Sequence, residues 1–237
     1  MKNVLSTVAL AFIFLTALQL SASAQDERPG IKIDAIAKAG DKVGDFVPKG
    51  WKIEENVSGD LNGDGIADHA LKLIEDIKST PDEPADRNRA LVLVFANNDG
   101  KLTRAAVSDK LLQCTSCGGA FYGVVDAPAN VKIEKGVLIV DQDRGSREVT
   151  ETTYRFRYDE QPSMFILIGF DYTSRDRANG EVSSESTNYL TGKRITTTGK
   201  GKKTTTKTTT VQKMRYSLEE VDADKFDEEA TNRLGLG

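Results

Sequence analysis

Turn-forming residues recur about every ten residues along most of this sequence, and the segments between them are apolar or alternate between apolar and polar side chains. The alternation is clearest in the segment 149–158, where Tyr154, Phe156 and Tyr158 are separated by Arg155 and Arg157. A period of two is typical of a β-strand that has one face in a core and the other in water. The sequence therefore predicts an all-β fold.

The predicted strands form two sets of four, and each set fits one antiparallel meander. The Asn-Asn-Asp-Gly sequence at 97–100 has strong hairpin chemistry and supports this connectivity. The second predicted strand, at 70–73, is ambiguous, because Ala70, Ile74 and Ile77 also fit one side of a helix. The alternation around Leu71 and Leu73 favours a strand. We expect propeller-blade-like or sandwich-like sheets, preceded by a short N-terminal helix or arm. The eight predicted strands lie at 51–57, 70–73, 90–96, 102–107, 131–133, 137–140, 149–158 and 164–172.

The amino terminus has the three-part pattern of a secretory signal peptide. Lys2 precedes an apolar run over 4–20, and Ala22-Ser23-Ala24 is a small-residue cleavage site. A membrane anchor is the alternative, but polar residues interrupt the run, which is shorter than the ~20 apolar residues that a span needs. We expect residues 1–24 to be removed and the protein to be exported, to the periplasm or outside the cell. No later segment is apolar and long enough to span a bilayer.

The stretch 60–68, reading DLNGDGIAD, is the strongest indication of a specific chemistry. Its side-chain oxygens recur at every second position, and Gly65 allows the chain to bend sharply around one point. Three carboxylates so close together repel one another, and a divalent cation relieves that repulsion. The alternative is an Asp/Asn/Gly-rich surface turn without a metal. The predicted Ca²⁺ ligands are hard oxygen atoms of Asp60, Asn62, Asp64, Ile66 (through its carbonyl) and Asp68.

This stretch resembles the calcium loops of FG-GAP and VCBS repeats, which occur in integrin-type β-propellers and in many secreted bacterial proteins. The resemblance rests on the pattern D-x-N-x-D-G-x-x-D between two short strands, and this chain has one such loop. It implies a calcium site in a β context, held by the five residues named above. An EF-hand is not expected, because Leu71 stands at position twelve, where that loop needs a bidentate Glu.

The last part of the chain differs in composition from the rest. Residues 191–213 contain seven Lys or Arg, ten Thr and no acid, which predicts a basic β-hairpin, and residues 219–229 contain seven acids against one Lys. Either the acidic tail neutralises the hairpin, or both are solvated, or the hairpin binds a polyanion such as a surface polysaccharide. The absence of aromatic residues from 191–213 argues against a nucleic acid. The candidate polyanion ligands are Lys193, Arg194, Lys200, Lys202, Lys203 and Lys207.

We divide the chain into a signal peptide (1–24), a β-rich domain with the calcium loop (25–190), and the basic hairpin with the acidic tail (191–237), the last packed on the same domain. Cys114 and Cys117 are the two cysteines, and in an exported protein they predict a disulfide across a tight turn, with redox-active thiols as the alternative.

The sequence favours a non-catalytic binding or structural module with an architectural calcium ion. His69 is the sole histidine, which excludes multi-histidine metal sites, and no G-x-S-x-G motif is present. A secreted hydrolase with an unrecognised carboxylate pair stays as the alternative, because acidic residues are plentiful. The mild net charge of −4 argues only for solubility. The partner, whether a polyanion or a protein, stays open.

Overall fold

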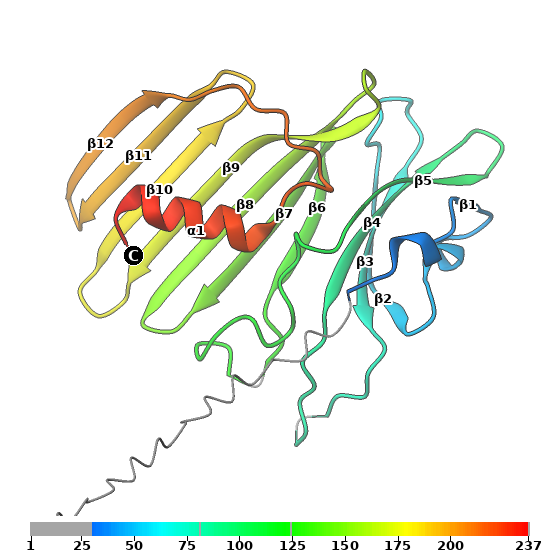
Figure 1. The fold of residues 1–237 in the computed structure, drawn as a ribbon, viewed down its shortest axis with the longest axis horizontal. Helices are drawn as coiled ribbons and strands as arrows, with labels where there is room; N and C mark the ends of the chain where they lie inside the picture. The colour runs from blue at the N-terminus through cyan, green and yellow to red at the C-terminus, as the bar shows by residue number, and fades with distance from the viewer. Residues whose placement is uncertain (1–29, 81, 124, 237) are drawn as a thin grey trace, which may run out of the picture.

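The structure is a computed structural model that describes residues 30–80, 82–123 and 125–236. Its strands form two antiparallel sheets, which confirms the all-β prediction (Figure 1). The predicted signal peptide at 1–24 lies outside the described residues. Among the described helices, none is long and apolar enough to cross a bilayer.

The small sheet has five strands in the order β1-β5-β4-β3-β2, which confirms the first predicted meander and adds the two-residue β1 to it. At β4 both faces of the sheet are buried, and this explains the nearly continuous apolar run of that strand. The Asp60–Asp68 stretch connects β2 to β3, and β3 is a strand, as the pattern around Leu71 favoured. The strands are β1 (Ala39–Gly40), β2 (Trp51–Gly59), β3 (Asp68–Glu75), β4 (Arg89–Ala96) and β5 (Leu102–Ser108).

The predicted N-terminal helix or arm is an irregular segment that covers the outer face of the small sheet. It contains two 3-10 helices, η1 (Ile33–Ala35) and η2 (Val43–Phe46), on either side of β1. Ile31, Ile36 and Phe46 are buried against Leu71, Leu73 and their neighbours on that face. The glycines at 40 and 44 break the helical spacing, which is why no longer helix forms.

The large sheet is a seven-stranded meander in the order β12-β11-β10-β9-β8-β7-β6. The four strands that come first in the sequence, β6 to β9, are those of the second predicted set. The strand β10 was not predicted. The basic hairpin, β11 with β12, continues this sheet at its far edge from the small sheet (Figure 1). The strands are β6 (Ala129–Glu134), β7 (Val137–Gly145), β8 (Glu148–Asp159), β9 (Met164–Asp176), β10 (Glu181–Asn188), β11 (Lys193–Lys200) and β12 (Lys203–Thr210).

The main core lies on the inner face of the large sheet, between it, the small sheet and one α-helix. Leu91 and Leu93 of the small sheet belong to the same buried cluster as Tyr154 and Phe170 of the large sheet. The helix α1 (Ala223–Leu234) crosses the inner face, with Phe226 packed edge-on against Tyr154 and Phe170 (Figure 1). Two unequal sheets that share one core are a sandwich-like arrangement, and the described residues contain no set of four-stranded blades around a channel as in a propeller.

The helix α1 corrects the expectation of a solvated acidic tail. Asp222 caps its first turn by accepting a hydrogen bond from the backbone N–H of Lys225, and Gly235 ends it in the left-handed conformation at φ 68°. Phe226 and Ala230 form its buried side, while the acids face outward or toward neighbouring arginines. The many acids of 219–229 suggested a solvated tail, whereas most of the segment belongs to a helix with one apolar stripe.

Candidate functional site

The Asp60–Asp68 loop joins two paired strands, as the resemblance to calcium loops implies. Gly59 pairs with Asp68 at the end of the hairpin, and Ser58 pairs with His69. Gly63 and Gly65 have φ values of 86° and 84°, so glycine is needed at both positions. His69 lies beside the loop in β3, where its Nδ1 is 3.1 Å from Asn56 Oδ1.

The side-chain oxygens of the loop turn inward, toward its own backbone. Asp60 accepts hydrogen bonds from the N–H groups of Gly63 (2.6 Å) and Gly65 (3.0 Å). Asn62 Oδ1 accepts from the N–H of Asp64, and Asp64 Oδ1 accepts from the N–H of Ile66. The side chains at 60, 62 and 64 therefore each accept at least one backbone N–H of the same loop.

Asp68 is fully buried and fixes the end of the loop. One carboxylate oxygen accepts the N–H of Leu61 at 2.8 Å, and the other accepts the N–H of Ala96 at 3.0 Å. Burial raises the pKa of this carboxyl, the two N–H groups oppose that rise, and the charges of Asp64 and Asp60 add to it. A cation in the bend would relieve this repulsion.

Within the described residues, no three His, Cys, Asp or Glu side chains are grouped as metal ligands would be. The predicted set includes one amide and one main-chain carbonyl besides its three carboxylates. Calcium binding by Asp60, Asn62, Asp64, Ile66 and Asp68 therefore stays a prediction. The relationship to FG-GAP and VCBS loops likewise stays a prediction.

Cys114 and Cys117 form a disulfide, as the sequence predicted. Between them, Thr115 is buried and has four hydrogen bonds that do not involve sulfur. Its N–H donates to the carbonyl of Arg87 and its carbonyl accepts from Ala127. Its hydroxyl accepts from the N–H of Arg87 and donates to the carbonyl of Ala85. The backbone and hydroxyl of Thr115 thus hold the turn by bonds that do not involve the disulfide.

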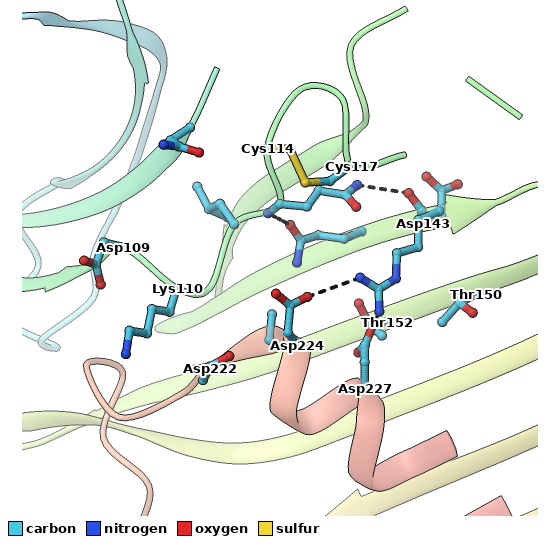
Figure 2. A pocket seen from close by; sticks show the side chains of 16 residues that line it. Asp109, Lys110, Cys114, Cys117, Asp143, Thr150, Thr152, Asp222, Asp224 and Asp227 are labelled. Carbon is cyan, nitrogen blue, oxygen red and sulfur yellow. Dashed lines mark hydrogen bonds and ion pairs between the residues drawn. A yellow bond between two sulfur atoms is a disulfide. The ribbon is translucent and has the colours of Figure 1, made fainter. Parts of the chain in front are cut away.

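A polar pocket of about 490 Å³ opens beside this turn, at the amino-terminal end of α1 (Figure 2). The segment 109–117 forms one wall, β7 and β8 form the floor, and α1 forms the other wall. Nothing in the sequence analysis singled this place out. The lining includes Asp109, Lys110, Gln113, Gln142, Arg144, Thr152, Asp222, Asp224, Asp227 and both cysteines.

Arg144 binds the two helix carboxylates that face this pocket. Its guanidinium is 2.6 Å from Asp227 and 3.3 Å from Asp224. Burial raises the pKa of Asp227 to about 6, although the positive charge of Arg144 acts in the opposite direction. Tyr154, at 3.4 Å from the same carboxylate, is also buried. Asp227 is thus an acid that titrates close to neutrality.

Asp143, the residue next to Arg144, does not pair with Asp227 across the pocket. Successive side chains of a strand point to opposite faces, so Asp143 projects from the other side of β7. There it accepts a hydrogen bond from Tyr122. Burial, with a further contribution from this hydrogen bond, raises the pKa of the Tyr122 phenol to about 12. In Figure 2 its carboxylate points away from those of Asp224 and Asp227. The two carboxyls of a glycosidase must face one cleft, and these two do not.

The predicted polyanion ligands are divided between the two faces of the hairpin. Strand alternation and the pairing of Lys200 with Lys203 place these two on the inner face together with Lys207. Lys202 lies in the two-residue turn, and Lys193 projects from the outer face. Arg194 is not available, because its Nε donates to Thr187 at 2.8 Å and lies 3.8 Å from buried Glu185.

The acidic tail does not neutralise the hairpin by direct contact. Asp224 and Asp227 pair with Arg144, and Glu229 pairs with Arg233. Within the described residues, no ion pair involves the five exposed lysines of the hairpin, namely Lys193, Lys200, Lys202, Lys203 and Lys207. The described residues thus show no direct pairing between the tail acids and these lysines, and both solvation and ligand binding of the hairpin remain open.

Comparison of the chain with protein-family models, with curated proteins and with solved structures found no match.

Proposed function

We propose that this protein is an exported, non-catalytic binding module in which a calcium ion stabilises the β2–β3 hairpin and the β11–β12 hairpin binds an anionic partner. The calcium ion would be architectural, because all of its predicted ligands come from one loop that joins two strands. The lysines of the hairpin would supply the binding surface.

The geometry of the Asp60–Asp68 loop is the observation that supports the calcium site best. Its side chains at 60, 62 and 64 accept backbone N–H groups of the same loop, and buried Asp68 ties the end of the loop to β4. Calcium favours six to eight oxygen ligands at 2.3–2.6 Å and accepts carboxylate, amide, carbonyl and water oxygens together. The loop offers the first three of these types, and water would complete the shell.

The hairpin supports the second part of the proposal. Its five lysines are exposed and have no ion-pair partner in the described chain, although seven acids follow within thirty residues. Unpaired charges of one sign on one edge attract an oppositely charged partner over about a Debye length, ~8–10 Å at physiological salt.

The hydrolase alternative has less support. In the pocket, Asp224 and Asp227 share one guanidinium, and Asp143 faces the other side of β7. A carboxylate pair across a cleft would need two unshared acids on one face.

Thermal unfolding with added calcium tests the first part. We expect millimolar CaCl₂ to raise the melting temperature of the wild type, magnesium to do so less, and Asp64→Ala to abolish the increase. Asp99→Ala is the matched control, because Asp99 is an exposed turn residue that accepts a backbone hydrogen bond from Lys101 outside the loop. An equal effect of calcium on the wild type and on Asp64→Ala would contradict the proposal.

Retention on a heparin-type resin tests the second part. We expect the wild type to elute at higher salt than the variant in which Lys200, Lys202, Lys203 and Lys207 are changed to Gln. The control changes Lys32, Lys38, Lys49 and Lys78 to Gln, which removes the same charge from exposed positions elsewhere. Equal elution of the two variants would show that net charge, and not the hairpin, governs retention.

A further inference from the structure

The strand β12 is an open edge of the large sheet. It pairs with β11 on one side, and no strand among the described residues pairs with it on the other. The opposite edge of the sheet is different, since β6 lies against β2 of the small sheet. In Figure 1, β12 is the outermost strand of the large sheet. An open edge presents a row of unpaired backbone N–H and C=O groups to solvent.

The pairing register shows which residues of β12 carry these free groups. The N–H of Val211 donates to the carbonyl of Gly192, directly after the last pair of the hairpin. Hydrogen-bonded and non-hydrogen-bonded pairs alternate along an antiparallel ladder, so the odd-numbered residues of β12 bond to β11. The even-numbered residues point their N–H and C=O groups outward, and all are threonines: Thr204, Thr206, Thr208 and Thr210.

The side chains along this edge suit an incoming strand. Threonine is β-branched and favours the extended conformation that strand pairing requires. Seven of the eight residues of β12 are exposed, with only Thr209 half-buried. Lys203 and Lys207 lie two pleats apart on one face, and Lys200 lies opposite Lys203.

We propose that the free edge of β12 binds an extended, acidic segment of another protein by adding it to the large sheet as a further strand. This inference rests on the proposed role of the hairpin as the binding surface, and it names the partner as a polypeptide. The outward groups of the four threonines would bond to the backbone of the segment. The lysines would select acidic side chains at alternate positions of it.

The same lysines disfavour pairing with a second copy of the chain. Two β12 strands side by side would bring Lys203, Lys207 and the turn lysine Lys202 of each copy to one edge. Like charges on neighbouring strands are destabilising, and lysine at an edge is a common protection against self-association. The partner is therefore expected to carry the opposite charge.

The test uses a capped synthetic peptide of alternating Glu and Thr, with binding to the wild-type protein measured by isothermal titration calorimetry. Two N-methylated versions carry the methyl groups on one or the other set of alternate residues. In strand addition, only one set of N–H groups faces β12, so methylation of that set should abolish binding and methylation of the other set should preserve it. Equal binding of both versions would overturn the proposal.

Thr206→Pro provides a matched variant of the protein. Its N–H points outward, so proline at this position leaves the ladder with β11 intact. We expect an unchanged melting temperature, unchanged retention on heparin-type resin, and peptide binding weakened at least roughly tenfold, with Thr206→Ser as the control. Retained peptide binding in Thr206→Pro would reduce the site to a charged surface and overturn the inference, while the proposed polyanion binding would stand. A wild-type dimer in sedimentation that Thr206→Pro abolishes would also overturn it, since the edge would then bind a second copy.

Discussion

The carboxylate of Asp68 accepts a 3.0 Å hydrogen bond from the backbone N–H of Ala96, 28 residues further along the chain. Its other oxygen accepts the N–H of Leu61. The last residue of the predicted calcium loop thus connects that loop to the end of β4. The bend is part of the fold of the small sheet, in contrast to a freely solvated surface turn.

Asp68→Ala is expected to lower the free energy of unfolding in urea by about 2–4 kcal/mol, because two backbone N–H groups lose a charged acceptor. Asp68→Asn keeps one acceptor oxygen and should lose about half as much. Both unfolding titrations are carried out with a calcium chelator present, so that bound calcium does not contribute to the measured stability. A loss in Asp68→Ala no larger than that in the surface variant Asp99→Ala would show that Asp68 does not anchor the loop.

Asp227 should make stability depend on pH in an unusual direction. Its pKa is about 6 in the folded protein against 3.8 for an unperturbed aspartate, so the folded protein holds the proton more tightly than the unfolded chain does. The contribution is then fully present below about pH 4 and is lost as the pH rises through 6, which amounts to about 3 kcal/mol. Urea unfolding of the wild type and of Asp227→Asn between pH 3.5 and 7 measures it. If the wild type gained stability relative to the variant as the pH rose, the ion pair with Arg144 would dominate over burial.

The disulfide between Cys114 and Cys117 should contribute little to stability. It closes a loop with a sequence separation of three, for which chain entropy predicts less than about 2 kcal/mol. Thr115→Val should cost as much or more, because it leaves the partly buried N–H of Arg87 and the carbonyl of Ala85 without their hydroxyl partner. The double variant Cys114→Ser/Cys117→Ser provides the comparison in the same urea titration. Unfolding of that double variant at room temperature would contradict this assignment.

Phe226 is expected to be the residue that docks α1 on the large sheet. Its ring contacts those of Tyr154, Phe170 and Tyr216. Phe226→Ala should lower the free energy of unfolding by about 3–5 kcal/mol. Phe121→Ala is the matched control, since that ring is 49% exposed and its loss should cost about 1 kcal/mol or less. Similar losses in the two variants would mean that α1 contributes little to the core.

Much of the strand architecture could be predicted from local patterns. Alternation of apolar and polar residues identified β2 and β8, and the turn at 97–100 identified the connection of β4 to β5. These signals are local, because a strand with one buried face has alternating apolar and polar residues in its own sequence. The strand β10 was missed because its sequence EVSSESTN has a single aliphatic residue, although Glu185 and Thr187 are buried within it.

The pocket could not be predicted because its parts come from distant segments. Arg144 and Asp227 are 83 positions apart, and no motif connects them. The helix α1 did have a local signal, in the spacing of Phe226, Ala230 and Leu234 by four residues, but the excess of acids in the same segment is equally typical of a solvated tail. Composition alone was misleading there, and periodicity would have corrected it.

Calcium binding at the Asp60–Asp68 loop is tested most directly by isothermal titration of the chelator-treated protein with CaCl₂. We expect one ion per chain with a dissociation constant of about 10⁻⁴–10⁻³ M, the range of extracellular modules, and loss of binding in Asp60→Ala and Asp64→Ala but not in Asp99→Ala. Absence of saturable binding by the wild type at about 10 mM calcium, roughly ten times the weakest dissociation constant expected, or equal binding by the wild type and Asp64→Ala, would contradict the calcium site.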